Sequence, residues 1–284
     1  MTGEAQSAYS VAVRTAYGVD APPDLKGAVQ HLQIAAEGGH RPAQSELAAL
    51  VGNWRLVRDI TAGKRVPSDT WQRLGAAVDA RAWLSMPAGR AVCDEPRIAM
   101  VKRFISADAC DWLVGLGKPH LQTAQTYDPD SGKWVADSGR TNRSAELLPE
   151  RSDSMVAFVR ARIAAFTGSS TSDLETSQVL HYAVGEQFAP HYDFLNVRHA
   201  ALAEQVAQYG QRVLTVLIYL NETYADGETY FPKLERGFKG RKGDALIFWN
   251  VTPAGTADPL TMHMGSAPTA GEKWLFSQWI RRRL

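Results

Sequence analysis

The sequence predicts an α+β protein in which a helical N-terminal part is followed by a β-rich domain. Apolar residues recur at intervals of three and four between Leu25 and Leu50, which is the spacing of an amphipathic helix. From Val179 onward the chain instead carries short runs of β-branched and aromatic residues, separated by turn sequences such as Asp226-Gly227. Helices followed by strands indicate a closed or double-sheet β domain with helical support.

Two helices are expected within the first fifty residues. The first has its apolar face over 25–36 and ends at Gly38-Gly39, and the second begins at Pro42 and ends near Gly52. This pair resembles one tetratricopeptide-like helical repeat. Because arrays of such repeats usually need about three copies to stand alone, we expect residues 1–90 to form a helical brace on a larger domain. A partner-recruiting array is the alternative.

The β domain is expected to occupy residues 91–284. Its polar segment 118–144 is rich in Gly, Asp and Ser and predicts a hairpin or a mobile loop. Helices are expected over 71–84, after Ser106 and over 155–166, and strands over 97–104, 179–184, 213–220, 228–231, 245–249 and 274–280.

Composition excludes several classes of function. Of the 284 residues, 31 are Lys or Arg and 30 are Asp or Glu, so the net charge of +1 gives no overall field for nucleic acid or an anionic membrane. No stretch approaches the ~20 apolar residues of a membrane helix, and the first residues lack the pattern of a signal peptide. We therefore expect a cytoplasmic protein without nucleic-acid or membrane partners. Two cysteines are too few for a disulfide scaffold.

The informative motif is His191-Tyr-Asp193. Alternate residues of a strand project to the same side, so these two side chains can reach one point. A third ligand from a neighbouring strand would complete two imidazoles and one carboxylate, the set that binds Fe(II) in non-haem oxygenases and leaves other positions open. By itself the motif is weak, because a lone histidine is more often an ordinary core or surface residue.

Several ordered blocks accompany this motif. His263 precedes Lys273 by ten residues, and Glu228-Thr-Tyr-Phe-Pro, Lys242-Gly-Asp-Ala-Leu-Ile-Phe and Trp279-Ile also occur. With them, residues 97–284 strongly resemble Fe(II)/2-oxoglutarate dioxygenases of the prolyl 4-hydroxylase type. The fold that this resemblance implies is a double-stranded β-helix, a jelly-roll core flanked by helices.

The resemblance also implies cofactors and site residues. The implied reaction hydroxylates an aliphatic C–H with O2 and converts 2-oxoglutarate to succinate and CO2, with ascorbate as a candidate reductant. A buried lysine would lose its charge or cost several kcal/mol unless a carboxylate offsets that penalty, in agreement with Lys273 as the partner of the distal carboxylate of 2-oxoglutarate. The resemblance assigns iron to His191, Asp193 and His263, and the cosubstrate to Lys273, Tyr182 and Thr215. For Tyr182 and Thr215, an ordinary place on a pleated strand stays an open alternative.

Substrate-side positions depart from the family pattern. Phe188 stands where a tyrosine is common, and Arg281 stands where the peptide enzymes carry histidine. Arg140 or Arg281 could clamp a free carboxylate with a bidentate pair, although each is also explained as a solvated arginine. The substrate-binding residues implied are Arg140, Glu175, Phe188, Trp279 and Arg281.

Three functions are weighed on this basis. The departures favour hydroxylation of a free proline-like cyclic amino acid, proline or pipecolate. The alternative is a peptidyl-prolyl hydroxylase whose peptide or protein substrate is recruited by the helical N-terminus. A catalytically silent binding module that retains the fold is the third hypothesis, and it predicts neither iron binding nor succinate formation.

Overall fold

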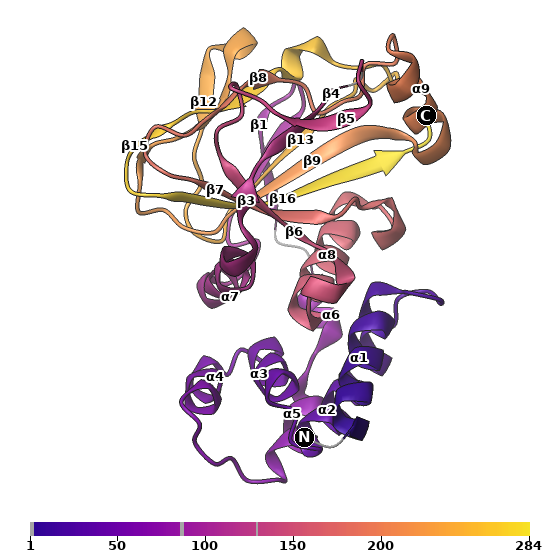
Figure 1. Ribbon diagram of the computed structural model, residues 1–284, viewed down its shortest axis with the longest axis vertical. Helices are drawn as coiled ribbons and strands as arrows, with labels where there is room; N and C mark the ends of the chain where they lie inside the picture. Colours follow the sequence, from indigo (N-terminus) through magenta and orange to yellow (C-terminus); the bar gives the residue numbers. More distant parts are fainter. Residues whose placement is uncertain (1–2, 86–87, 129) are drawn as a thin grey trace. The chain divides into compact units, whose positions relative to one another are not determined.

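The computed structural model describes residues 3–85, 88–128 and 130–284 (Figure 1). The chain forms two compact units. One consists of residues 1–86 and 148–171, and the other of residues 87–147 and 172–284. The structure thus adds residues 148–171 to the N-terminal helices, whereas a domain boundary near residue 90 stays a prediction.

The first unit is helical. Side-chain caps start several of its helices: Asp24, His40 and Asn53 each accept a hydrogen bond from a backbone N–H in the first turn of α2, α3 and α4, respectively. The helices are α1 (Gly3–Tyr17), α2 (Leu25–Glu37), α3 (Arg41–Leu50), α4 (Trp54–Thr61), α5 (Thr70–Ala77), α6 (Ala80–Leu84) and α8 (Ser154–Thr167).

Helix α8 completes this unit although it lies far away in the sequence. It packs against α1, α3 and α6. Ala16, Ala28 and Ala157 meet in a buried cluster, where small side chains let the helices approach closely. A carboxylate is also buried at the start of α8, because Glu46 accepts hydrogen bonds from the Tyr9 hydroxyl (2.5 Å) and the Ser154 N–H (2.9 Å).

The second unit contains two facing antiparallel sheets. The eight-stranded sheet has the order β1-β2-β13-β9-β16-β7-β6-β3, and the four-stranded sheet has the order β12-β11-β14-β8. Two-stranded pairs are formed by β4 with β5 and by β10 with β15. The helices of this unit are α7 (Ala107–Gly117) and α9 (Ala200–Tyr209).

The strands are short, and most are 3–6 residues long. Their bounds are β1 (Gly89–Cys93), β2 (Ile98–Val101), β3 (Gln122–Thr123), β4 (Gln125–Asp128), β5 (Lys133–Ala136), β6 (Arg143–Leu147), β7 (Ser177–Tyr182), β8 (Phe188–His191), β9 (Gln211–Tyr219), β10 (Ala225–Asp226), β11 (Thr229–Phe231), β12 (Arg236–Phe238), β13 (Ala245–Trp249), β14 (His263–Gly265), β15 (Pro268–Ala270) and β16 (Lys273–Arg282). Short 3-10 turns lie at Lys118–His120, Pro149–Arg151, Thr171–Asp173, Pro232–Leu234 and Pro259–Thr261.

The core of this unit lies between the two sheets. Alternate residues of the central strands point inward, as Leu217 and Tyr219 do in β9 and Leu246 and Phe248 do in β13. From the opposite sheet, Phe231 meets the Phe248 ring edge to face, with centroids 5.3 Å apart. Full burial of one such side chain contributes ~1.5–3 kcal/mol. The arrangement is the jelly roll that the resemblance implies, so the predicted fold class is confirmed.

Several elements differ from the sequence prediction. The polar segment 118–144 contains the predicted hairpin, formed by β4 and β5. A strand that carries both His191 and Asp193 was expected, but β8 ends at His191, and strand β14 and helix α9 were not predicted. Among the described helices, none is both long enough and apolar enough to cross a membrane.

Candidate metal centre and its pocket

Three potential metal ligands meet where β8 and β14 pair. His191 is the last residue of β8 and His263 is the first of β14, and the two are direct partners across the antiparallel pair. One ligand atom from each of His191, Asp193 and His263 lies within 4.8 Å of the others. The Nε2 atoms of His191 and His263 are 3.7 and 3.6 Å from the two carboxylate oxygens of Asp193. The structure therefore brings together the three residues assigned to iron, although Asp193 lies just beyond the end of β8 rather than on it.

Outer hydrogen bonds orient each of these side chains. The Nδ1–H of His191 donates to the Ala189 carbonyl (2.9 Å), and that of His263 donates to the Thr261 carbonyl (3.0 Å). With Nδ1 protonated, the lone pair of each imidazole is on Nε2, which faces Asp193. The carboxylate of Asp193 accepts a hydrogen bond from the Thr215 hydroxyl (2.7 Å).

The electrostatics of the cluster suit a divalent cation. Burial, reinforced by the neighbouring imidazole of His263, lowers the pKa of His191 to about 3. Burial alone would raise the pKa of Asp193, but the two imidazoles and the Thr215 hydroxyl hold it below its ordinary value. Near neutral pH the cluster therefore offers a neutral His191 imidazole and an ionised carboxylate, as metal ligands must.

Lys273 is buried without a partner. It begins β16 directly opposite Tyr182 in β7 and is 0% exposed. Its Nζ finds no hydrogen-bond partner in the described part of the chain and lies 4.8 Å from the centre of the Tyr182 ring. Burial, together with the nearby charge of Lys239, lowers the pKa of Lys273 to about 7. An orphaned buried ammonium is costly unless an anion joins it, so this position fits the distal carboxylate of 2-oxoglutarate.

Tyr182 and Thr215, the other two residues assigned to the cosubstrate, lie in different surroundings. Tyr182 is buried beside Lys273, and its hydroxyl approaches Gly265. Thr215 is buried on β9, and its hydroxyl is bonded to Asp193 rather than directed at Lys273. The contact that the structure gives Thr215 is therefore with a potential metal ligand.

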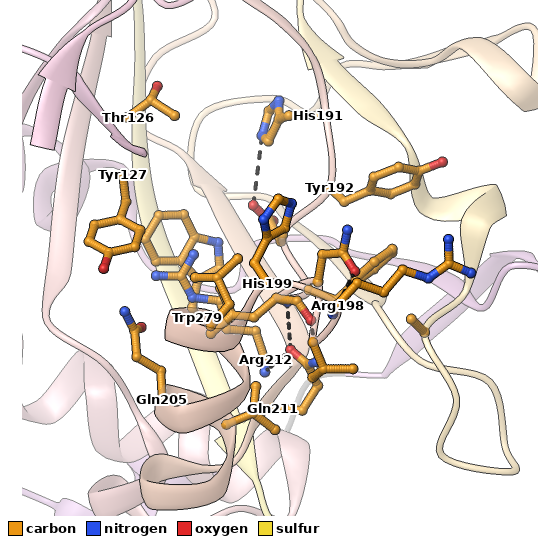
Figure 2. Close-up of a pocket in the computed structure, with 18 of the residues that line it drawn as sticks. Thr126, Tyr127, His191, Tyr192, Arg198, His199, Gln205, Gln211, Arg212 and Trp279 are labelled. Carbon is orange, nitrogen blue, oxygen red and sulfur yellow. Dashed lines mark hydrogen bonds and ion pairs between the residues drawn. The ribbon is translucent and has the colours of Figure 1, made fainter. Parts of the chain in front are cut away.

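A cavity of about 1450 Å³ opens beside the potential metal ligands, and His191 and Asp193 are part of its lining (Figure 2). The β4–β5 hairpin contributes Tyr127 and Trp134 to its wall, and α9 contributes Leu202 and Gln205. Tyr127 and Trp134 contact each other edge to face, and Trp134 is largely exposed. These aromatic and apolar side chains extend the contact surface of the cavity beyond the potential metal ligands.

Arg140 and Phe188, two predicted substrate residues, line this cavity. The Phe188 ring stacks on the His191 imidazole, with centroids 3.6 Å apart. The Arg140 guanidinium lies 4.5 Å from the centre of the Phe188 ring and donates from Nη1 to the Gln125 carbonyl (2.7 Å). Its Nε lacks a hydrogen-bond partner, and no ion pair to Arg140 is found among the described residues. The Nε–H of Arg140 is thus a buried donor without a partner in the part of the chain that the structure describes.

Glu175 and Arg281 lie behind the cavity wall rather than in it. Glu175 binds Arg212 through two hydrogen bonds of 2.6 and 2.7 Å, and it binds Arg281 at 2.6 Å. The Arg212 guanidinium stacks on the Trp279 ring at 3.8 Å, and both of these residues line the cavity. The Nε1–H of Trp279 is buried without a partner in the described structure.

Arg212 was missed from the sequence. Strand alternation counted from Thr215 does not predict that Arg212 lines the cavity, because the β9–β16 register is irregular. Ile280 lies opposite Leu214, whereas the next residue, Arg281, lies opposite Arg212. A bulge of this kind leaves no signal in the sequence pattern.

Residues 177–281 match the family model described as the 2OG-Fe(II) oxygenase superfamily. The chain is 32% identical over 210 residues to probable prolyl 4-hydroxylase 10 of Arabidopsis thaliana, covering 66% of this chain and 69% of that protein. It is 36% identical over 208 residues to probable prolyl 4-hydroxylase 6 of the same plant, covering 66% and 70%. A solved structure, the 2-oxoglutarate complex of a viral collagen prolyl hydroxylase from Paramecium bursaria Chlorella virus-1, is similar with a TM-score of 0.50 and 25% identity over 67% of this chain and 98% of that one.

Proposed function

Because the chain belongs to the prolyl 4-hydroxylase family of 2-oxoglutarate/Fe(II) oxygenases, we propose that it hydroxylates prolyl residues within a peptide or protein. It is a dioxygenase that uses Fe(II), 2-oxoglutarate and O2. The observation that carries the choice of substrate is the open cavity of about 1450 Å³ beside the metal-binding residues. Small-molecule pockets usually measure ~300–1,000 Å³, so this cavity suits several residues of an extended chain.

Each side chain has a role in this proposal. His191, Asp193 and His263 hold the iron, and Lys273 receives the distal carboxylate of 2-oxoglutarate. When bound, the iron and 2-oxoglutarate supply the activation of O2 that hydroxylates a C–H bond and yields succinate and CO2. The substrate residues of this chain orient the peptide.

Three residues of the cavity wall are available for that orientation. The Arg140 guanidinium and the Trp279 ring line the cavity, where they can contact the backbone of the substrate. Phe188 presents an apolar ring beside the metal ligands, against which a pyrrolidine ring can pack. The hairpin side chains Tyr127 and Trp134 can cover the flanking residues and exclude water.

The expected preference for a free amino acid is not supported. It relied on Arg281 or Arg140 as a clamp for a free carboxylate. The Arg281 guanidinium is already bound to Glu175 and to the Gly210 carbonyl, and it does not line the cavity. Arg140 has one of its nitrogens committed to the Gln125 carbonyl. The relatives, moreover, are named as prolyl 4-hydroxylases.

Direct turnover tests the proposal. Purified protein supplied with Fe(II), 2-oxoglutarate and O2 should add one oxygen atom to a Pro-rich peptide and release succinate, as followed by mass spectrometry. His191→Ala should abolish both signals, while His120→Ala, which changes an exposed histidine in the same unit, should retain them. Product formed from free proline or pipecolate but not from the peptide would overturn the assignment.

Recruitment of the target by the N-terminal helices is also part of the proposal. Ile34 on α2 is 54% exposed and offers an apolar contact point. If the helices recruit the target, Ile34→Glu in the full chain should raise the KM for a protein substrate and leave the KM for a short peptide unchanged. Equal KM values of wild type and variant for the protein substrate would show that the exposed face of α2 at Ile34 does not recruit the target.

A further inference from the structure

A buried chain of hydrogen bonds leads from the metal carboxylate to the end of a neighbouring strand. The Thr215 hydroxyl donates to the carboxylate of Asp193 (2.7 Å), and the side-chain amide of Asn250 donates to the same hydroxyl oxygen (2.9 Å). Asn250 is 0% exposed and follows directly after β13. We call Asn250, Thr215 and Asp193 the carboxylate relay.

The backbone around Asn250 is rigidly held. Its N–H donates to the Val213 carbonyl in β9, and its carbonyl accepts from the Asp258 N–H, each at 2.9 Å. Thr215 lies on β9 opposite Phe248 of β13. Asn250 and Thr215 are therefore fixed by paired strands of the large sheet, whereas Asp193 lies on a segment that has just left β8.

Hydrogen-bond chemistry fixes the direction of the relay. An ionised carboxylate only accepts, so the single proton of the Thr215 hydroxyl must point to Asp193. The hydroxyl oxygen then needs a donor, which the Asn250 amide supplies. The Oδ1 atom of Asn250 has no partner in the described structure, so this side chain is used here only through its donor end. Donors lined up in this way polarise one another in a dry interior.

We propose that Asn250 is a positioning residue for the metal centre: through the Thr215 hydroxyl it fixes the orientation of the Asp193 carboxylate between the two imidazoles. The relay acts before any substrate binds, and it therefore does not depend on the proposed peptide substrate. In the carboxylate relay Thr215 acts on the ligand Asp193, and Asn250 acts on Thr215 although Asn250 does not line the cavity.

The test is metal binding in the absence of 2-oxoglutarate and substrate. Titration with Mn(II), which takes the same ligand types, reports affinity per folded protein without turnover. Removal of outer hydrogen-bond partners of metal ligands typically costs 10–100-fold in affinity. We expect Thr215→Val and Asn250→Leu each to weaken Mn(II) binding by about tenfold, and Thr215→Ser, which keeps the hydroxyl, to bind like wild type.

The double variant distinguishes a relay from two separate effects. If Asn250 acts only through Thr215, Asn250→Leu should have no further effect when Val already replaces Thr215. Thr123→Val, an exposed threonine on β3, is the matched control and should leave the affinity unchanged.

Two results would overturn the proposal. One is wild-type Mn(II) affinity in folded Asn250→Leu, which would mean a merely structural residue. The other is multiplicative weakening in the double variant, which would mean that Asn250 acts independently of Thr215. If Asn250→Leu does not fold, the comparison of Thr215→Val with Thr215→Ser still decides whether the hydroxyl orients the ligand, and Asn250→Ala decides whether the amide does.

Discussion

The unpartnered ammonium of Lys273 predicts that 2-oxoglutarate binding is coupled to a proton. In the protein without cosubstrate, burial lowers the pKa of Lys273 to about 7, so the side chain is largely neutral above that pH. A carboxylate bound beside it restores the ordinary preference for the charged form. Binding above pH 7 must therefore take up a proton, and the affinity should fall as the pH rises.

The magnitude follows from this pKa. With a ligand-free pKa of about 7, the dissociation constant should rise about tenfold between pH 6 and pH 8, and about 0.9 proton should be taken up at pH 8. Anaerobic calorimetry on the Fe(II)-loaded protein measures both quantities when it is repeated in buffers of different ionisation enthalpy. Lys273→Arg should bind without this pH dependence, because arginine stays charged throughout the range.

Two outcomes would refute the reasoning. A dissociation constant that is flat between pH 6 and pH 8 would show that Lys273 is charged before the ligand arrives. An undiminished slope in Lys273→Arg would show that a different group titrates. The same lowered pKa makes the folded protein bind fewer protons than the unfolded chain between about pH 7 and pH 10.5. Without cosubstrate, this lysine should therefore make stability rise with pH in that window.

Three further predictions concern other parts of the chain. Burial, with the nearby Asp153 carboxylate, raises the pKa of Glu46 to about 8. Between about pH 4.5 and pH 8 the folded protein therefore binds one proton more than the unfolded chain, and its stability falls as the pH rises. Glu46→Gln should remove this pH dependence of stability in thermal unfolding. Glu175→Gln should lower the free energy of unfolding by about 3 kcal/mol, because it leaves two arginines mostly buried without a carboxylate, and chemical denaturation measures this. Gly265→Ala should raise the KM for 2-oxoglutarate, because the added Cβ would lie 2.9 Å from the Tyr182 hydroxyl and displace it. Its Mn(II) affinity should stay unchanged. An unchanged KM would show that Tyr182 does not contribute to 2-oxoglutarate binding.

The parts of the fold that were predictable from sequence are those with long apolar runs. Strands β7, β9, β13 and β16 were expected because their β-branched and aromatic residues form continuous runs in a core buried on both faces. Strands β8 and β14 are only four and three residues long and each includes a histidine, so apolar periodicity could not define their bounds. Helix α9 has no buried residue, and its apolar residues Leu202 and Val206 line the cavity rather than the core.

The candidate site shows the same division. The three potential metal ligands were found because their spacing and the ordered sequence blocks around them can be read directly from the sequence. The contacts of the surrounding residues cannot be read in this way. Glu175 and Arg281 are 106 residues apart, and only the folded chain shows that they neutralise each other. Asn250 likewise gave no signal, because its partner Thr215 lies 35 residues earlier.

The course of the backbone makes the helical unit inseparable from the oxygenase. The polypeptide leaves the large sheet after β6, contributes α8 to the N-terminal helices, and only then returns as β7, the strand that carries Tyr182. Removing the first 85 residues would strip the apolar side chains Met155 and Phe158 of the helices that shield them. Strands β6 and β7 are paired, and the segment that connects them contains α8. If the N-terminal helices unfolded, this segment would become a long flexible loop, and keeping β6 and β7 paired would carry an entropic penalty. Deletion experiments on this chain would consequently report damage to the β-sheet unit as much as loss of a recruiting module.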